Sequence, residues 1–121
     1  MKKVLIVDDQ TEVRELVRVT LNSGVYHIFQ ASNGEDAVRL AEAETPDLII
    51  MDIMMPGGID GLEAARRIRQ IPACAKCSIV MLTAKGQETD RQASLEAGAN
   101  NYFSKPFSPL ELIRKVEEIL G

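Results

Sequence analysis

The stretch Asp47-Leu48-Ile49-Ile50-Met51-Asp52-Ile53-Met54-Met55-Pro56 decides the fold of this chain. An apolar run of this length, closed by a proline and two glycines, is typical of a strand buried on both faces of a sheet. Such a strand should carry no charge, yet Asp52 stands at its carboxyl end. Ligands bind at the carboxyl ends of strands in open parallel sheets, which makes Asp52 a candidate functional residue. The alternative is that Asp52 only begins the following turn, where Asp is common.

The composition indicates one soluble globular domain. The chain has 121 residues, of which 45% are hydrophobic and 26% charged, enough to bury a core. Its net charge of -4 argues against direct binding to DNA, which requires a basic surface. No apolar run approaches the roughly twenty residues of a membrane span, and the start is too short for a signal peptide. We therefore expect a cytoplasmic protein with a single domain over residues 1–121 and no output domain.

Two cysteines form a C-x-x-C motif, Cys74-Ala75-Lys76-Cys77. A thioredoxin-like redox pair opens a helix after a strand, whereas this motif lies after a predicted helix and before a predicted strand. A tetrahedral zinc site would need two further ligands, and His27 is the only histidine. The motif therefore favours two incidental thiols over a redox or metal function.

Apolar runs and helical patterns alternate five times along the chain. The runs cover residues 4–7, 26–31, 47–52, 78–82 and 101–103, and the helices are expected over 11–22, from 33, over 60–69, over 88–97 and from 108. The last helix is expected to bury Leu110, Ile113, Val116 and Leu120. This alternation predicts an α/β fold, with a parallel sheet between two layers of helices. Five units favour the doubly wound, flavodoxin-like (βα)5 architecture with strand order 2-1-3-4-5.

Polar side chains follow four of the five predicted strands: Asp8 and Asp9, Asp52, Thr83, and Lys105. The carboxyl ends of parallel strands share one edge, so these groups are expected to converge. Two carboxylates about 4 Å apart repel by roughly 4 kcal/mol at a surface-like dielectric, and one lysine cannot neutralise three acids. A hard divalent cation such as Mg²⁺ can, and a phosphoryl group could then bind the metal, the ammonium and the hydroxyl. A carboxylate is the plausible acceptor of that phosphoryl group.

Over its whole length the sequence resembles the receiver domain of bacterial two-component response regulators, most closely the stand-alone, CheY-like kind. The resemblance is carried by Val7-Asp8-Asp9, Met51-Asp52-Ile53-Met54-Met55-Pro56, Asp60-Gly61, Leu82-Thr83-Ala84 and Lys105-Pro106-Phe107. Each of these motifs is weak alone, but together and in this order they are highly specific.

The resemblance implies a role for each acidic residue of the predicted cluster. Asp52 matches the phosphoacceptor, which attacks the phosphohistidine of a sensor histidine kinase or phosphotransfer protein. Asp9 matches the direct Mg²⁺ ligand, and Asp8 helps to hold the metal or its water, with Mn²⁺ as the alternative ion. Met54 matches the position whose backbone carbonyl completes the metal shell.

The resemblance also implies a conformational switch. Lys105 matches the cation that bonds the phosphoryl group, and its peptide bond to Pro106 is cis in the family. Thr83 matches the hydroxyl that closes on the phosphate, and Tyr102 the aromatic residue that then turns inward. Repacking would alter the face formed by the fourth helix, fifth strand and fifth helix, where a downstream protein binds. The domain would act as a monomer or a weak phosphorylation-dependent dimer, and its output would be binding rather than enzymatic turnover.

Each of these three residues also has a simpler interpretation. Lys105 could be a solvated surface lysine, Thr83 a strand-end residue, and Tyr102 a packing residue. All three simpler interpretations would have to hold at once, alongside acids at two strand ends, which favours the functional one.

The sequence departs from the family in the loop after the buried strand. The family usually has two residues between the proline and Asp-Gly, whereas Gly57-Gly58-Ile59 makes three. Adjacent glycines widen the range of backbone conformations, so weak ordering of residues 57–59 is expected in the metal-free form. Side chains at Met54 and Lys85 lie where they could shield or contact the phosphate.

Two other functions are compatible with an α/β fold of this size. A phosphatase of the haloacid-dehalogenase-like class would need a second Asp two residues after the nucleophile, where this chain has Met54, which cannot donate a proton. A flavodoxin-like electron carrier would need a phosphate-binding loop after the first strand, where Asp8 and Asp9 would repel the flavin phosphate.

Overall fold

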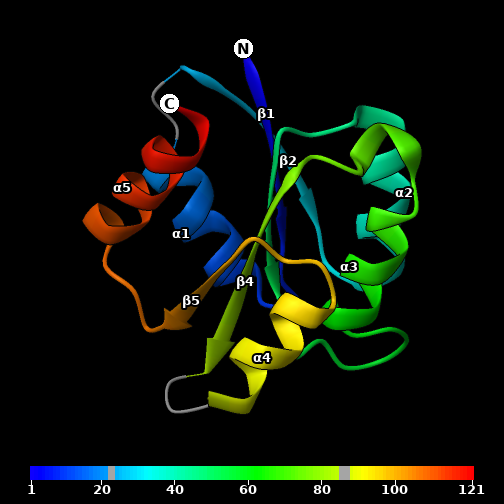
Figure 1. Ribbon diagram of the computed structural model, residues 1–121. Coiled ribbons are helices and arrows are strands. Elements are labelled where there is room, and N and C mark those ends of the chain that lie inside the picture. Colours follow the sequence, from blue (N-terminus) through cyan, green and yellow to red (C-terminus); the bar gives the residue numbers. More distant parts are fainter. Residues whose placement is uncertain (22–23, 85–87) are drawn as a thin grey trace.

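The computed structural model, which describes residues 1–21, 24–84 and 88–121, has a five-stranded parallel sheet in the order β2-β1-β3-β4-β5 (Figure 1). The strands are β1 (Lys2–Val7), β2 (Tyr26–Ala31), β3 (Leu48–Asp52), β4 (Ser78–Ala84) and β5 (Asn101–Lys105). The helices are α1 (Thr11–Leu21), α2 (Gly34–Glu44), α3 (Gly61–Arg69), α4 (Glu88–Glu96) and α5 (Pro109–Leu120), with a 3₁₀ turn, η1 (Pro72–Cys74). The predicted fold class and strand order are confirmed.

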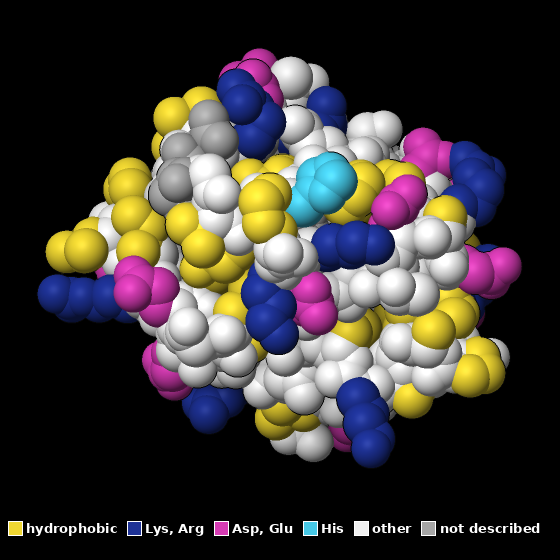
Figure 2. All heavy atoms as spheres, turned by 90° about the horizontal axis from the view of Figure 1, so that it is seen from above, with side chains coloured by type: hydrophobic (Ala, Val, Ile, Leu, Met, Phe, Trp, Pro, Cys, Tyr) yellow, Lys and Arg dark blue, Asp and Glu magenta, His cyan; other side chains and the backbone are white. Residues whose placement is uncertain are grey.

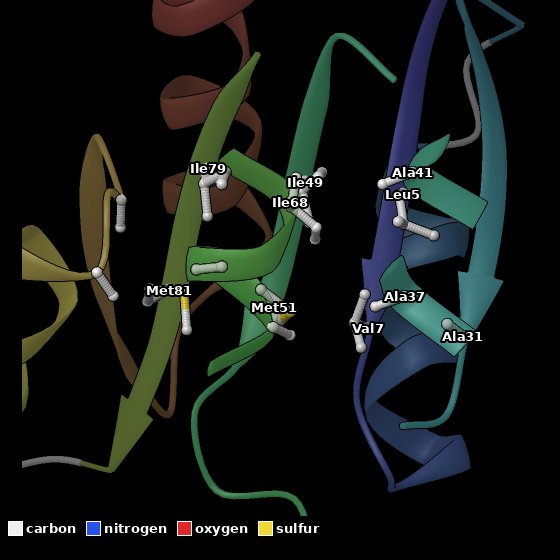
Figure 3. Close-up of a cluster of buried hydrophobic side chains, with 14 of the residues drawn as sticks. Leu5, Val7, Ala31, Ala37, Ala41, Ile49, Met51, Ile68, Ile79 and Met81 are labelled. Carbon is white, nitrogen blue, oxygen red and sulfur yellow. The ribbon is translucent and has the colours of Figure 1, made fainter. Parts of the chain in front are cut away.

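Helices cover both faces of the sheet. Alternate residues of β1, β3 and β4 pack with α2 and α3 on one face, through Leu5, Ile49 and Met81 (Figure 3). The intervening residues pack with α1 and α5 on the other face, through Ile6 and Ile50. All five residues of β3 are buried, as expected for the central strand of a sheet with two helical layers. Burying one such aliphatic side chain contributes about 1.5–3 kcal/mol, so β3 anchors the fold.

Side-chain caps set the first residue of three helices. The Asn33 side chain accepts a hydrogen bond from the backbone N–H of Asp36 at the start of α2. The Asp60 side chain accepts a hydrogen bond from the backbone N–H of Glu63 at the start of α3. The Ser108 side chain accepts one from the backbone N–H of Glu111 at the start of α5. These bonds satisfy donors that the first turn of a helix leaves unpaired, and for this reason the helix starts were visible in the sequence.

Two details differ from the sequence prediction. The side chain of Leu110 is 55% exposed, whereas the buried residues of α5 are Leu112 and Val116. Val116 is buried as predicted and Ile113 and Leu120 are half-buried, so the prediction is wrong only at Leu110, whose place in the buried stripe is taken by Leu112. The turn η1 was not predicted, since a single 3₁₀ turn has no hydrophobic period.

In the parts of the chain that are described, no helix combines the length and the apolar character needed to cross a lipid bilayer. Figure 2 views the end of the molecule where the strands begin, with the single histidine, His27, near its centre. Acidic and basic side chains are interspersed on this face, so it presents no large field of one sign (Figure 2).

Candidate phosphoacceptor and metal site

The carboxyl ends of β1, β3 and β5 bring the predicted acids and the predicted lysine together. Val7, the last residue of β1, pairs with Met51 in β3. The next residues of the two segments, Asp8 and Asp52, therefore lie next to each other. Side chains alternate along a strand, and Asp52 therefore faces the α1 and α5 side, as Ile50 does. Lys105 shares that face with Phe103, from which it is two residues removed.

Asp52 and Lys105 line a groove at the edge of the sheet, and Asp8 is buried beside them. Its polar end contains Asp9, Asp52 and Lys105, and its apolar side is formed by residues of α1 and of the segment before α5, namely Val13, Leu16, Pro106 and Phe107. The apolar lining was not foreseen, because the helical period of α1 predicts Leu16 as a core residue. Leu16 is instead 45% exposed.

The acidic cluster is tight and only partly neutralised. One carboxylate oxygen from each of Asp8, Asp9 and Asp52 lies within 4.8 Å of the others. The ammonium of Lys105 donates a hydrogen bond to Asp8 Oδ2 at 2.9 Å and lies 3.5 Å from Asp52 Oδ2. Asp8 is fully buried and Asp52 is 7% exposed, while Asp9 faces solvent. Three carboxylates against one ammonium leave an excess of negative charge, and two of the three carboxylates are buried.

This charge balance shifts the titration of Asp52. Burial, and then the negative charge of Asp8, raise the pKa of the Asp52 carboxyl from 3.8 to about 6. Lys105 and the backbone N–H of Met54 oppose that rise without cancelling it. For Lys105, burial works to lower the pKa, but its hydrogen bond to Asp8 and the charge of Asp52 outweigh burial, and its pKa is raised. The Asp52 carboxylate is thus held in an environment that disfavours its negative charge.

Two hydrogen bonds that the sequence did not predict hold Asp8 in place. Its Oδ1 accepts a hydrogen bond from the backbone N–H of Gln10 at 2.9 Å, an Asx-type turn that leads into α1. The guanidinium of Arg14 donates to the Asp8 carbonyl at 2.7 Å. An Asp three residues ahead of a helix start is the only local sign of such a turn, and the role of Arg14 depends on where α1 lies.

The loop from Ile53 to Gly61 begins and ends beside the carboxyl end of β3. The backbone N–H of Ile53 bonds to the carbonyl of Leu82 at 3.1 Å, and that of Gly61 bonds to the carbonyl of Ile53 at 2.9 Å. A Cβ on Gly61 would lie 2.2 Å from the carbonyl oxygen of Asp52, so only glycine permits this closure. Met54 lies between the residues joined by these two hydrogen bonds, and it is 71% exposed.

The two predicted switch residues lie on the other face of the sheet. Thr83 is buried at the end of β4 and pairs with Ser104 of β5, whose hydroxyl bonds to that of Tyr102 at 3.3 Å. By strand alternation these side chains share the face of Met81, toward α2 and α3. Neither Thr83 nor Tyr102 is among the described residues that line the groove.

The other features singled out in the sequence are the Lys105–Pro106 peptide bond, Lys85 and the two cysteines. The peptide bond between Lys105 and Pro106 is cis. Lys85 lies outside the described residues. Cys74 and Cys77 are buried free thiols just before β4, at the opposite end of the sheet from the acids, and burial raises the pKa of both.

The donor set fits a hard divalent cation. The three carboxylates supply oxygen ligands, their excess negative charge needs compensation, and the exposure of Asp9 gives access from solvent. In the described part of the chain, this trio is the only group of three or more acidic, histidine or cysteine side chains close enough to share one ion.

A sequence profile described as "Response regulator receiver domain" matches residues 4–117. The chain belongs to this family. It is 43% identical over 119 residues to the alkaline phosphatase synthesis transcriptional regulatory protein PhoP of Bacillus subtilis, a match that covers 98% of this chain and 48% of PhoP. The receiver domain described here thus spans about half the length of the curated relatives it matches.

Two solved structures show the same fold. One, from Chloroflexus aurantiacus and described as a response regulator, has a TM-score of 0.91 and 40% identity, and the match covers 98% of this chain and 97% of that one. The other is the receiver domain of a sensor histidine kinase from Pseudomonas aeruginosa PAO1, with a TM-score of 0.89 and 34% identity over 99% of this chain and 98% of that one. That second structure has a magnesium ion coordinated in its active-site cleft.

Proposed function

We propose that this receiver domain is a phosphorylation switch of two-component signal transduction, with Asp52 as its Mg²⁺-dependent phosphoacceptor. The observation that carries the proposal is the position of Asp52 at the end of β3. Its carboxylate lies 3.5 Å from the ammonium of Lys105 and in one cluster with Asp8 and Asp9. This arrangement, together with membership of the receiver family, supports transfer to Asp52 over a purely structural role for the acids.

The carboxylates of Asp8, Asp9 and Asp52, with the backbone carbonyl of Met54, would hold the Mg²⁺ ion, for which Mn²⁺ is an alternative. Bound there, the ion would supply the positive charge that the cluster lacks and would withdraw charge from phosphoryl oxygens. The groove opens to solvent beside Asp9, so a donor can approach Asp52 from the α1 side.

The chain's own groups perform the transfer. A carboxylate oxygen of Asp52 attacks the phosphorus of a phosphohistidine, an O–P bond forms, the P–N bond breaks, and the electron pair of that bond remains on the imidazole nitrogen of the kinase or phosphotransfer protein. Lys105, already near Asp52, donates hydrogen bonds to the phosphoryl oxygens as their charge develops. The domain thereby assists its own phosphorylation and later hydrolysis, but it is a switch and not an enzyme with a separate substrate.

The output is a change in binding. Thr83 would close on the phosphoryl group from the rim of β4, and Tyr102 would then repack on the face that it shares with Thr83. The surface formed by α4, β5 and α5 changes as a result, and a downstream protein that prefers the new surface shifts the population. We infer that residues 1–121 form one such domain, acting in the cytoplasm as a monomer or a weak phosphorylation-dependent dimer, and that the domain itself does not contact DNA.

Labelling by a small phosphodonor tests this function. The unaltered protein should gain one phosphoryl group from acetyl phosphate when Mg²⁺ is present and none when the metal is chelated, as measured by intact mass. Asp52→Asn should abolish the gain. The matched control is Asp36→Asn, on the surface of α2 where Asp36 pairs with Arg39, and it should be labelled normally. Undiminished labelling of Asp52→Asn would show that another residue is the acceptor.

A further inference from the structure

A carboxylate on α2 contacts the loop that follows the acceptor. Oε2 of Glu35 accepts a hydrogen bond from the backbone N–H of Ile59 at 3.2 Å. The same carboxylate lies against Gly58, where a Cβ would be 2.4 Å from Oε2. Gly57 and Gly58 have φ values of +76° and +91°, a backbone region that favours glycine. The glycines therefore let the main chain both turn here and approach the Glu35 side chain.

The neighbouring residue of α2 receives the side chain of Ile59. A Cβ on Gly34 would lie 2.5 Å from Ile59 Cγ1 and 2.8 Å from the Ile59 carbonyl oxygen. The absence of a side chain at Gly34 thus makes a notch that Ile59 fills. Glu35 binds the main chain of Ile59 while Gly34 accommodates its side chain, so the start of α2 contacts this one residue in two independent ways.

This contact lies on the segment that carries the proposed metal-binding carbonyl. The loop is closed at its base by the bond from Gly61 N–H to the Ile53 carbonyl, and Met54 is the next residue after Ile53. The base fixes Ile53 and Gly61, the backbone N–H of Met54 bonds to the Asp52 carboxylate, and Met55 is buried in the core. The contact at Ile59 holds the far end of the same loop, where the two glycines widen the range of backbone conformations.

We propose that Glu35 is a positioning residue, which holds the three-residue segment Gly57-Gly58-Ile59 against α2 and thereby keeps the Met54 carbonyl directed at the acidic cluster. The inference rests on the proposed function, since it assigns Met54 to the metal shell. It also predicts an ordered loop in the metal-free protein, opposite to the weak ordering that the paired glycines indicate in the sequence.

The test compares Glu35→Ala, Glu35→Gln and the control Glu42→Ala, which removes an exposed carboxylate from the same helix. Amide hydrogen exchange of Ile59 in EDTA measures the restraint, and a Mg²⁺ titration followed by amide NMR shifts measures the metal affinity. A net hydrogen bond is worth about 1 kcal/mol, so Glu35→Ala should speed exchange and weaken Mg²⁺ binding by about fivefold each. Glu35→Gln keeps an oxygen that accepts the same bond and should stay within about twofold of the unaltered protein.

A second variant attacks the other contact. Gly34→Ala places a methyl group where Ile59 packs, and it should reproduce both effects of Glu35→Ala while leaving the carboxylate in place. Equal Mg²⁺ affinity in Glu35→Ala and Glu42→Ala would overturn the proposal, even if Ile59 exchanges faster. An equal loss in Glu35→Ala and Glu35→Gln would also overturn it, because the effect would then come from charge. Neither measurement uses a phosphodonor, so a failure of Asp52 labelling would sink the proposed function separately.

Discussion

Replacing Asp52 by Asn should make the metal-free protein more stable at neutral pH. Burial and the charge of Asp8 raise the pKa of the Asp52 carboxyl from 3.8 to about 6, so the native state binds this proton more tightly than the unfolded chain does. The stability gained from the proton is complete below pH 4 and is lost as the pH rises through about 6. Asparagine imitates the protonated form at every pH and therefore keeps that stability.

The magnitude follows from the same pKa. One pKa unit corresponds to about 1.36 kcal/mol, so ionising Asp52 in the native state costs about 3 kcal/mol above pH 7. The side chain is 10% exposed and lines the groove, so about 3 kcal/mol is the upper end of this cost. For a chain of this size, 3 kcal/mol corresponds to an increase of about 10 °C in Tm.

Urea titrations in EDTA at pH 4, 5, 6 and 7.5 measure the difference between Asp52→Asn and the unaltered protein. The free energies of unfolding should agree at pH 4 and differ by about 3 kcal/mol at pH 7.5, with half of the change near pH 5. Asp36→Asn, a surface carboxylate, should show no comparable pH-dependent gain. Saturating Mg²⁺ should narrow the gap, because it stabilises the protein that keeps all three acids. Equal stability at pH 7.5 in EDTA would refute the account of a strained, desolvated carboxylate.

Three other substitutions give separate checks. Gly61→Ala should destabilise the fold by about 3 kcal/mol in urea titrations, because the new Cβ would lie 2.2 Å from the Asp52 carbonyl oxygen. Arg69→Met should cost about 3 kcal/mol by the same assay, since its guanidinium binds carbonyl groups in two separate segments, whereas the exposed Arg66→Met should change stability by less than about 0.5 kcal/mol. Lys105→Met should slow labelling by acetyl phosphate by about 10- to 100-fold, the value of a charge-assisted hydrogen bond of about 1.5–3 kcal/mol.

The central sheet could be predicted from the sequence because burial on both faces leaves a simple signal. The run from Leu48 to Met51 has no polar residue, and a proline and glycines end it. The convergence of Asp8, Asp52 and Lys105 followed from topology alone, since parallel strands end at one edge. The helix starts at Asn33, Asp60 and Ser108 were equally local, because a cap and its partner are three residues apart.

What could not be predicted depends on contacts between distant segments. In α5 the first turn exposes Leu110 and buries Leu112, and either leucine would fit an apolar stripe that continues through Val116. The contact from Glu35 to Ile59 joins residues 24 apart in sequence, and the glycine pair in the same loop gives no local sign of it. Thr83 and Tyr102 share the face of Met81 by strand alternation, but which helices cover that face follows only from the fold.

Burial stabilises β3 and, together with the charge of Asp8, destabilises the ionised carboxylate at its end. Burial of Leu48 through Met51 contributes about 1.5–3 kcal/mol for each side chain, while burial and the charge of Asp8 together cost the ionised Asp52 about 3 kcal/mol. The strand can therefore hold one unfavourable carboxylate and still be a net stabilising element. A ligand that compensates the charge at Asp52 relieves a cost already present in the fold, and part of that cost becomes binding free energy. If the carboxylate at this position were more exposed, the protein would be more stable without the ligand and would bind the ligand less tightly.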